Sequence, residues 1–116
     1  MNLTLNTEGP VDVVTVEEDR IDAAVAVDFK DAFRSLTTDR EGAVVLDLNR
    51  VAFLDSSGLG SVVAVQKLLG EGRPLELAGL QPAVAKVMQL TRMHTVFSIH
   101  PTLSAALAAH GSAPAA

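Results

Sequence analysis

The sequence places a carboxylate, two hydroxyls and two glycines side by side in the segment FLDSSGLGSVV: Asp55, Ser56, Ser57, Gly58 and Gly60. A serine hydroxyl can act as a nucleophile, accept a phosphoryl group, or cap a helix by accepting a backbone N–H. The apolar residues before the segment are typical of a strand, and those after it are typical of a helix. We therefore expect the segment at a helix N-terminus, where unpaired N–H groups and the helix dipole favour an acceptor or an anion.

The glycines are the most informative residues of this segment. Gly58 and Gly60 fall at the start of the predicted helix, where each costs about 1 kcal/mol of helix propensity relative to alanine. They indicate that another backbone, or a bulky anion, comes close to this helix start. Ser56 has two interpretations: its residue type favours an N-cap, but Asp55 could be the cap instead and leave the Ser56 hydroxyl free.

Other chemistries fit the segment poorly. The sequence contains neither the GxxxxGK[ST] pattern of a phosphate-binding loop nor the GxSxG pattern of a serine hydrolase. A serine hydrolase would still need a base for Ser56, and His94 and His100 are the candidates. Asp22 or Asp55 would then orient that base. No His, Asp and Glu residues have the spacing of metal ligands, so we expect no metal and no cofactor.

Composition limits the class of protein. With 116 residues, 48% of them hydrophobic and 20% charged, the chain fits one domain with a packed core. The net charge of −5, with nine scattered lysines and arginines, argues against direct binding to nucleic acid. The chain has no cysteine, so disulfides and thiol chemistry are excluded. It lacks an apolar run of about 20 residues and a signal-peptide pattern, so we expect a cytoplasmic protein without membrane contact.

Before the serines, the pattern predicts a hairpin and a helix. Alternating and β-branched residues at 3–9 and 11–17, separated by Gly9-Pro10, predict two strands and a turn. Residues 20–21 are a candidate short strand. Apolar residues then mark one face of a helix that ends near Thr38: Val25, Phe29, Ala32, Phe33 and Leu36. Asp22 has a structural interpretation as the N-cap of this helix.

The rest of the chain predicts a crossover unit and two further helices. A continuous apolar run at 42–48 is typical of a central strand, and the helix at 57–69 connects it to a parallel strand at 74–79. A helix from Pro82, a strand at 95–99 and a helix from Pro101 to His110 follow. His110 is expected at most to contact the end of that helix. We predict an α/β single domain at 1–110, with a mixed sheet of about five strands and about four helices, and a flexible tail at 111–116.

The helix after the serines is apolar almost all round. Only Ser61, Gln66 and Lys67 mark a polar face. A helix of this kind is either fully buried or exposes part of its apolar surface to a partner. Because full burial is difficult in so small a domain, we expect an exposed apolar patch beside Ser56.

The segment VVLDLNRVAFLDSSGLGSVVAVQKLL resembles the central strand, loop and helix of bacterial anti-sigma factor antagonists, which are stand-alone members of the STAS domain family. The hexamer DSSGLG is its most specific part. The preceding RID and the closing LELAGLQPAVAKVMQLTRMHTVFSIHPTLSAALAA extend the resemblance over nearly the whole chain. The resemblance implies a STAS-like fold and a binding protein rather than an enzyme.

The resemblance also implies roles for particular residues. Ser56, directly after the aspartate, corresponds to the phosphorylation site, and Asp22 to a residue associated with recognition by the kinase. The implied partner is an anti-sigma factor of the ATP-binding histidine-kinase-like fold that is also the serine kinase. The unphosphorylated antagonist binds it and frees a sigma factor, and a PP2C-type phosphatase resets the cycle. We expect the partner surface to comprise residues of the loop and the helix start: Asp22, Asp55, Ser57, Gly58, Leu59, Gly60, Val62 and Val63.

Two features qualify this expectation. The family often has Gly-Glu two residues before the aspartate that corresponds to Asp22, whereas this chain has Asp19-Arg20, so the kinase contact could differ in charge. STAS domains also serve as non-phosphorylated accessory subunits of lipid-transport ABC systems, which bind an ATPase through a similar helix. The complete DSSGLG, with a serine directly after the aspartate, favours the antagonist.

Overall fold

The computed structural model describes residues 1–111, and the predicted flexible tail lies, apart from Gly111, outside the described residues. The described chain alternates strands and helices, which confirms the predicted α/β class. Its elements, in chain order, are β1 (Leu3–Glu8), β2 (Val11–Val16), β3 (Arg20–Ile21), α1 (Ala26–Thr37), β4 (Val44–Asp47), β5 (Phe53–Leu54), α2 (Ser56–Leu69), β6 (Leu75–Ala78), α3 (Pro82–Leu90), the 3-10 helix η1 (Met93–Thr95), β7 (Ser98–His100) and α4 (Leu103–Ala109).

Five strands form the main sheet in the order β1-β2-β4-β6-β7. β1 pairs with β2 as an antiparallel hairpin, and the other neighbours are parallel. This confirms the predicted hairpin and the crossover from β4 through α2 to β6. β3 and β5 form a separate two-stranded parallel ribbon. The candidate short strand at 20–21 is confirmed as β3, whereas the sequence analysis did not predict β5.

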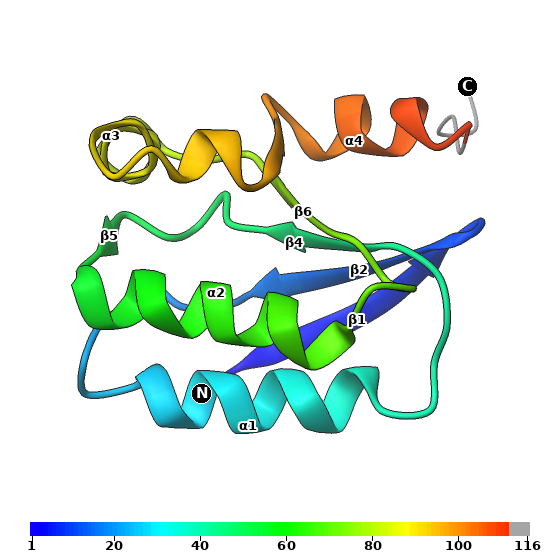
Figure 1. The fold of residues 1–116 in the computed structure, drawn as a ribbon, viewed down its shortest axis with the longest axis horizontal. Coiled ribbons are helices and arrows are strands. Elements are labelled where there is room, and N and C mark those ends of the chain that lie inside the picture. Colours follow the sequence, from blue (N-terminus) through cyan, green and yellow to red (C-terminus); the bar gives the residue numbers. More distant parts are fainter. Residues whose placement is uncertain (112–116) are drawn as a thin grey trace.

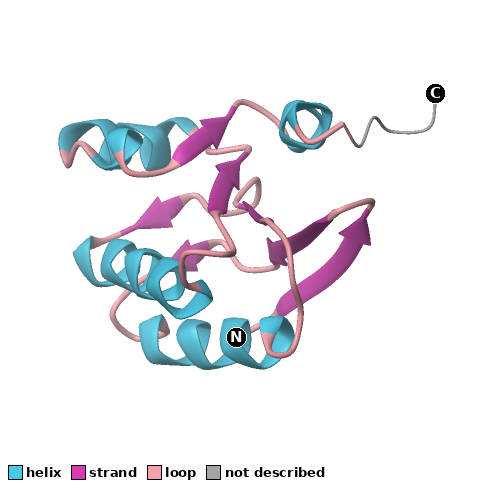
Figure 2. Ribbon diagram, turned by 45° about the vertical axis from the view of Figure 1, so that its right-hand side comes forward, coloured by secondary structure: helices cyan, strands magenta, loops and turns pink. Residues whose placement is uncertain are grey.

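The sheet separates two cores. The larger core lies between the sheet and α1, α2 and α3, and the smaller one lies between the sheet and α4, as the two sides of Figure 2 show. α1 and α2 lie side by side, and β5 lies at the same end of the molecule as the start of α2 (Figure 1). All four residues of β4 are buried, as the continuous apolar run predicted.

Three predicted boundaries are wrong. α1 begins at Ala26 with Val25 as its N-cap, so Asp22 does not cap it. The strand predicted at 95–99 is β7 at Ser98–His100, because Thr95 belongs instead to η1, which follows Arg92 in a left-handed conformation (φ 60°). The last helix begins after Thr102, whose hydroxyl accepts the N–H of Ala105 at 3.0 Å, rather than at Pro101.

A partly buried ion-pair network joins the amino ends of the parallel strands. Arg40 donates two hydrogen bonds to the carboxylate of Asp12, at 2.8 and 3.0 Å, and Arg73 donates a third at 3.1 Å. Arg73 also donates to the carbonyls of Thr37 and Gly42, so it fastens the α1–β4 connection to the sheet. The hydrogen bonds from Arg40 hold the pKa of Asp12 below its ordinary value of 3.8, against the opposing effect of burial.

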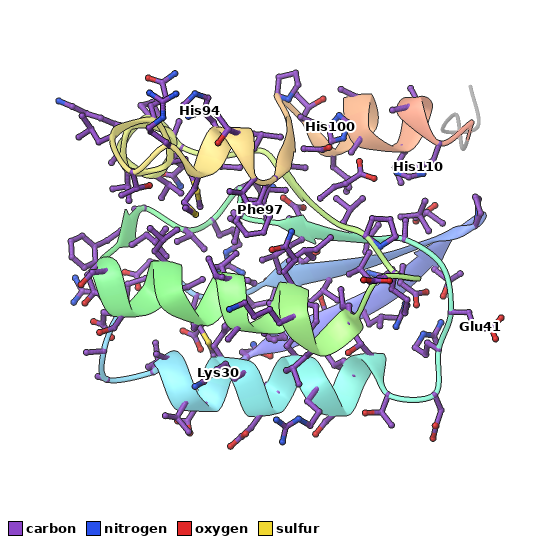
Figure 3. The ribbon with its side chains drawn as sticks, in the orientation of Figure 1. Lys30, Glu41, His94, Phe97, His100 and His110 are labelled. Atoms are coloured by element: carbon purple, nitrogen blue, oxygen red, sulfur yellow. The ribbon has the colours of Figure 1, made fainter. Side chains whose placement is uncertain are left out.

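Two further carboxylates lie on the sheet. His100 and His110 place their Nε2 atoms 2.5 Å from the two oxygens of Glu76, so His110 fastens the end of α4 to β6 rather than contacting only its own helix (Figure 3). Asp47, at the end of β4, is 5% exposed and accepts one hydrogen bond, from the N–H of Asn49 at 3.1 Å. Burial raises the pKa of Asp47 above its ordinary value.

Candidate functional site

The start of α2 is capped by Asp55 and not by Ser56. Asp55 has an extended backbone, and its Oδ1 accepts the N–H of Gly58 at 2.8 Å. Its carbonyl accepts the N–H of Leu59 at 2.8 Å. Ser56 is therefore the first helical residue, so its interpretation as the N-cap is wrong and the alternative, with Asp55 as the cap, is confirmed.

Asp55 also holds the loop before α1. Its second oxygen, Oδ2, accepts the N–H of Ala23 at 3.2 Å. In that loop, Asp22 accepts the N–H of Ala24 at 3.1 Å through its own side chain, which forms a local turn. Asp22 and Asp55, both predicted for the partner surface, therefore lie in adjoining segments, because Asp55 joins the loop that holds Asp22 to the start of α2.

The serine hydroxyls are open to solvent. Ser56 and Ser57 are both exposed, and neither hydroxyl makes a hydrogen bond within residues 1–111. Ser56 lies in the first turn of a 14-residue helix, where the helix dipole is positive. The hydroxyl is accessible to an enzyme, and its position favours a negative charge.

The two glycines have different neighbours. Gly58 is buried, and a Cβ added to it would lie 1.9 Å from the carbonyl oxygen of Ile21 and 2.8 Å from the Cδ1 of Leu54. The backbone that approaches Gly58 is thus that of β3 in the same chain, not that of a partner. Gly60 is exposed, and a Cβ added there would have no atom within 4 Å.

Burial reduces the predicted partner surface. Val62 is fully buried, as is Gly58, so the prediction that these two contact a partner is corrected. Ser61, expected on a polar face, is 3% exposed and donates to the carbonyl of Gly58 at 2.6 Å. The predicted residues that keep some exposure lie around Ser56: Asp22, Asp55, Ser57, Leu59, Gly60 and Val63.

The β3–β5 ribbon adds two exposed residues that the sequence reasoning missed. Arg20 lies opposite Phe53 in the ribbon, and Ile21 lies opposite Leu54. The guanidinium carbon of Arg20 is 5.4 Å from the centre of the Phe53 ring, within the range of a cation–π contact. The unusual Asp19-Arg20 dipeptide was a signal for Arg20, but Phe53 could be placed only once β5 was known.

The histidines do not support a serine hydrolase. His100 contacts Glu76, and the Nδ1 of His94 lies 3.5 Å from the carbonyl of Met88. Figure 3 shows His100 and His110 displaced toward α4, away from the start of α2. In the part of the chain that the structure describes, no three His, Cys, Asp or Glu side chains are arranged to hold a metal ion. Within residues 1–111, no helix has the length and apolar character needed to cross a membrane.

The described chain is an α/β domain with a mixed sheet and a helix, α2, that is capped by Asp55 and presents an exposed serine. Comparison with known sequences identifies the family of this domain. The family model described as "Mlab, STAS domain" matches residues 3–109. A STAS-domain containing protein of Pseudomonas aeruginosa (strain UCBPP-PA14) is 33% identical over 82 residues, which are 69% of this chain and 79% of that protein. The chain belongs to the STAS domain family.

Solved structures agree with this assignment. An anti-sigma factor antagonist from Mycobacterium paratuberculosis is similar with a TM-score of 0.83 and 30% identity, covering 93% of this chain and 92% of that one. The anti-sigma factor antagonist SpoIIAA in its unphosphorylated form has a TM-score of 0.70 at 19% identity, covering 95% and 97% of the two chains. At this identity, the similarity to SpoIIAA shows only that the two chains share a fold. The predicted resemblance to anti-sigma factor antagonists is confirmed.

Proposed function

We propose that this chain is an anti-sigma factor antagonist controlled by phosphorylation of Ser56. Its unphosphorylated form binds an ATP-binding anti-sigma factor of the histidine-kinase-like fold, which is also the serine kinase, and so frees a sigma factor. A PP2C-type phosphatase removes the phosphate. The observation that carries the proposal is the free, exposed Ser56 hydroxyl at the start of α2, next to an aspartate that already caps the helix.

The comparisons support this proposal in two ways. The similar protein from Mycobacterium paratuberculosis is an anti-sigma factor antagonist at 30% identity. The same fold is also known for SpoIIAA of Bacillus in a phosphorylated form, at a TM-score of 0.65. Phosphorylation is therefore compatible with a fold of this kind.

The proposed switch follows from charge. A phosphate on Ser56 adds about −1.5 to −2 charge, which the positive end of the helix dipole tolerates. The same charge beside Asp55 adds repulsion and desolvation in a close interface. Disrupting such an interface typically costs about 2–5 kcal/mol, which corresponds to a complex weaker by about 30- to 4000-fold. The phosphate would thus block the surface locally while the fold is retained.

A binding role without catalysis fits the form of the site. Ser56 lies on an exposed helix start, whereas a cavity of about 520 Å³ lies at the other end of α2, lined in part by Lys67, Arg73 and Val96. An exposed site outside that cavity favours a protein partner over a small substrate, because small-molecule sites are concave. We place this activity in one domain, residues 1–110, acting in the cytoplasm without contacting nucleic acid or membrane directly.

The test is intact-mass spectrometry after incubation with ATP and each candidate anti-sigma factor. We expect one added phosphate in the wild type and in the matched control Ser57→Ala, and none in Ser56→Ala. The phosphorylated protein should lose binding to the anti-sigma factor. A stable complex in which Ser56 is never phosphorylated would contradict the proposal.

A second candidate is the non-phosphorylated accessory subunit of a lipid-transport ABC system. The description of the matching family model, which names Mlab and not an anti-sigma factor antagonist, favours it. Stable binding to a transporter ATPase that is unaffected by Ser56→Ala, together with the absence of phosphate, would support this candidate. Ser56 would then be only an exposed residue of the helix start.

A further inference from the structure

We propose that Arg20 and Phe53 form a specificity-determining contact beside Ser56, and that they receive an acidic side chain flanked by an apolar one from the anti-sigma factor. The inference rests on the proposed function, because it names the chemistry of the partner at that same site. Neither residue belongs to the partner surface that the DSSGLG segment predicts. Both are positioned by the ribbon that adjoins the start of α2.

The ribbon has a buried side and an exposed side. Ile21 and Leu54 are 0% and 4% exposed, and the carbonyl of Ile21 packs against Gly58. Arg20 and Phe53 alternate with them and point away from the core: the Arg20 side chain is 59% exposed and Phe53 is 47% exposed. Neither side chain is needed to fill the core.

Backbone hydrogen bonds fix the ribbon that carries this pair, and Phe53 is close to the serine along the chain. The carbonyl of Asp19 accepts the N–H groups of Ala52 and Phe53, at 2.7 and 3.2 Å, which fixes the start of the ribbon. Phe53 precedes Ser56 by three residues, a separation of at most about 11 Å along an extended chain. A protein that covers Ser56 therefore meets the ribbon as well, on a surface that needs little ordering before it binds.

Arg20 has unused hydrogen-bonding capacity. A guanidinium carries five N–H donors. Within residues 1–111, Arg20 makes one side-chain hydrogen bond, to Asp22 Oδ2 at 3.4 Å, which is long for a charge-assisted bond. The guanidinium carbon lies 5.4 Å from the centre of the Phe53 ring. A guanidinium with free N–H donors can bind a carboxylate through two parallel hydrogen bonds.

The surrounding charges favour a single carboxylate on a protein over a free anion. Asp19, Asp22 and Asp55 lie in the same loop and helix start, and the chain as a whole carries a net charge of −5. A small, highly charged anion would be repelled by these groups. A carboxylate carried on an apolar segment instead meets Arg20 with its charge and Phe53 with its apolar part.

The test measures the Kd of the unphosphorylated chain for the anti-sigma factor that binds the wild type. We expect Arg20→Glu and Phe53→Ala each to weaken binding by about tenfold or more. Arg34→Glu makes the same charge change at an exposed position on α1, and Leu68→Ala shortens a similarly exposed apolar side chain at the end of α2; both should leave the Kd unchanged. The loss caused by Arg20→Glu should shrink as the salt concentration is raised, because ions screen an exposed charge pair.

The outcomes separate the inference from the proposed function. If the wild type binds and Ser56→Asp releases it, but Arg20→Glu and Phe53→Ala bind like the wild type, the inference is overturned and the proposed function stands. If the wild type binds no anti-sigma factor, both fail. Arg20→Lys keeps the charge and loses the planar fork, so it should weaken binding less than Arg20→Glu. Equal unfolding midpoints of the variants would show that the losses are not due to unfolding.

Discussion

Gly58→Ala and Gly60→Ala add the same methyl group to the same helix, and we expect them to change stability in opposite directions. At Gly60 the methyl group meets no atom within 4 Å. The substitution then only removes the low helix propensity of glycine, which stabilises the folded state by about 0.5–1 kcal/mol. For a domain of this size, that corresponds to a rise in Tm of about 2–5 °C.

At Gly58 the same gain in propensity is outweighed by a steric overlap. The added Cβ would lie 1.9 Å from the carbonyl oxygen of Ile21 and 2.8 Å from its carbonyl carbon. Both are backbone atoms, which no rotamer change can move, so relief requires β3 to shift away from α2. Forcing extra volume into a packed site costs about 1–3 kcal/mol or more, and we expect a net loss of about 2 kcal/mol. The fall in Tm is then about 8 °C or more.

The assay is equilibrium unfolding in urea, followed by far-UV circular dichroism, for the wild type and both variants. The slopes of the transitions should agree, so that the midpoints report stability alone. We expect the midpoint of Gly60→Ala above the wild type and that of Gly58→Ala below it. A Gly58→Ala protein as stable as the wild type would refute the close packing of β3 on α2, and with it the rigid placement of Arg20.

Three further predictions concern the aspartates. Asp12→Ala should lower the free energy of unfolding by about 1–3 kcal/mol, since it removes the charge-assisted hydrogen bonds that the buried carboxylate accepts from Arg40 and Arg73. The pKa of Asp12 is lowered in the folded state, so the ionised carboxylate stabilises the fold at pH values above its ordinary pKa of 3.8. This contribution should be lost as the pH falls through the folded-state pKa. Urea unfolding midpoints measured at several pH values would show the loss. Asp47→Asn should raise stability at pH 7 and lose that advantage in acid, because burial raises the pKa of Asp47 and its ionised form costs stability as the pH rises; an unchanged midpoint at pH 7 would contradict this. Asp55→Asn should lower the free energy of unfolding by about 1 kcal/mol and speed hydrogen exchange at the Ala23 amide, because the NH2 group of asparagine would replace one of the two oxygens that accept N–H groups from Gly58 and Ala23. Unchanged exchange at Ala23 would contradict the hydrogen bond between Asp55 and the loop before α1.

The sequence predicts the fold where the pattern is long and local. The continuous run that becomes β4, the hairpin of β1 and β2, and the apolar face of α1 are each visible within a few residues. The short strand expected at 20–21 is confirmed as β3, but its pairing with β5 is not visible in the sequence, because β5 has two residues and the two strands are separated along the chain by α1 and β4. The start of η1 depends on a left-handed residue, Arg92, that is not a glycine.

The errors at the site have a common physical cause. Helical periodicity identifies the face that holds Gly58 and Val62, but it does not identify what covers that face. Here the cover is Ile21, from a strand far earlier in the chain, together with the main core. A glycine that permits close approach by a partner and one that permits close approach by its own chain look the same in the sequence. Only Gly60 remains a candidate for close approach by a partner, since a Cβ added there would have no atom of the described chain within 4 Å.

The choice of cap shows why the serine remains available. Both aspartate and serine cap helices well, so residue type alone does not decide between them. At this junction, two N–H groups converge from different elements: Gly58 from α2, and Ala23 from the loop before α1. A carboxylate has two separate oxygens, and each accepts one of these N–H groups, whereas a serine hydroxyl would have to accept both at a single oxygen. Asp55 is therefore better suited than a serine to cap α2 and to hold the loop before α1 at the same time. Because Asp55 caps the helix, the Ser56 hydroxyl is not needed as a cap and stays exposed at the positive end of the helix dipole.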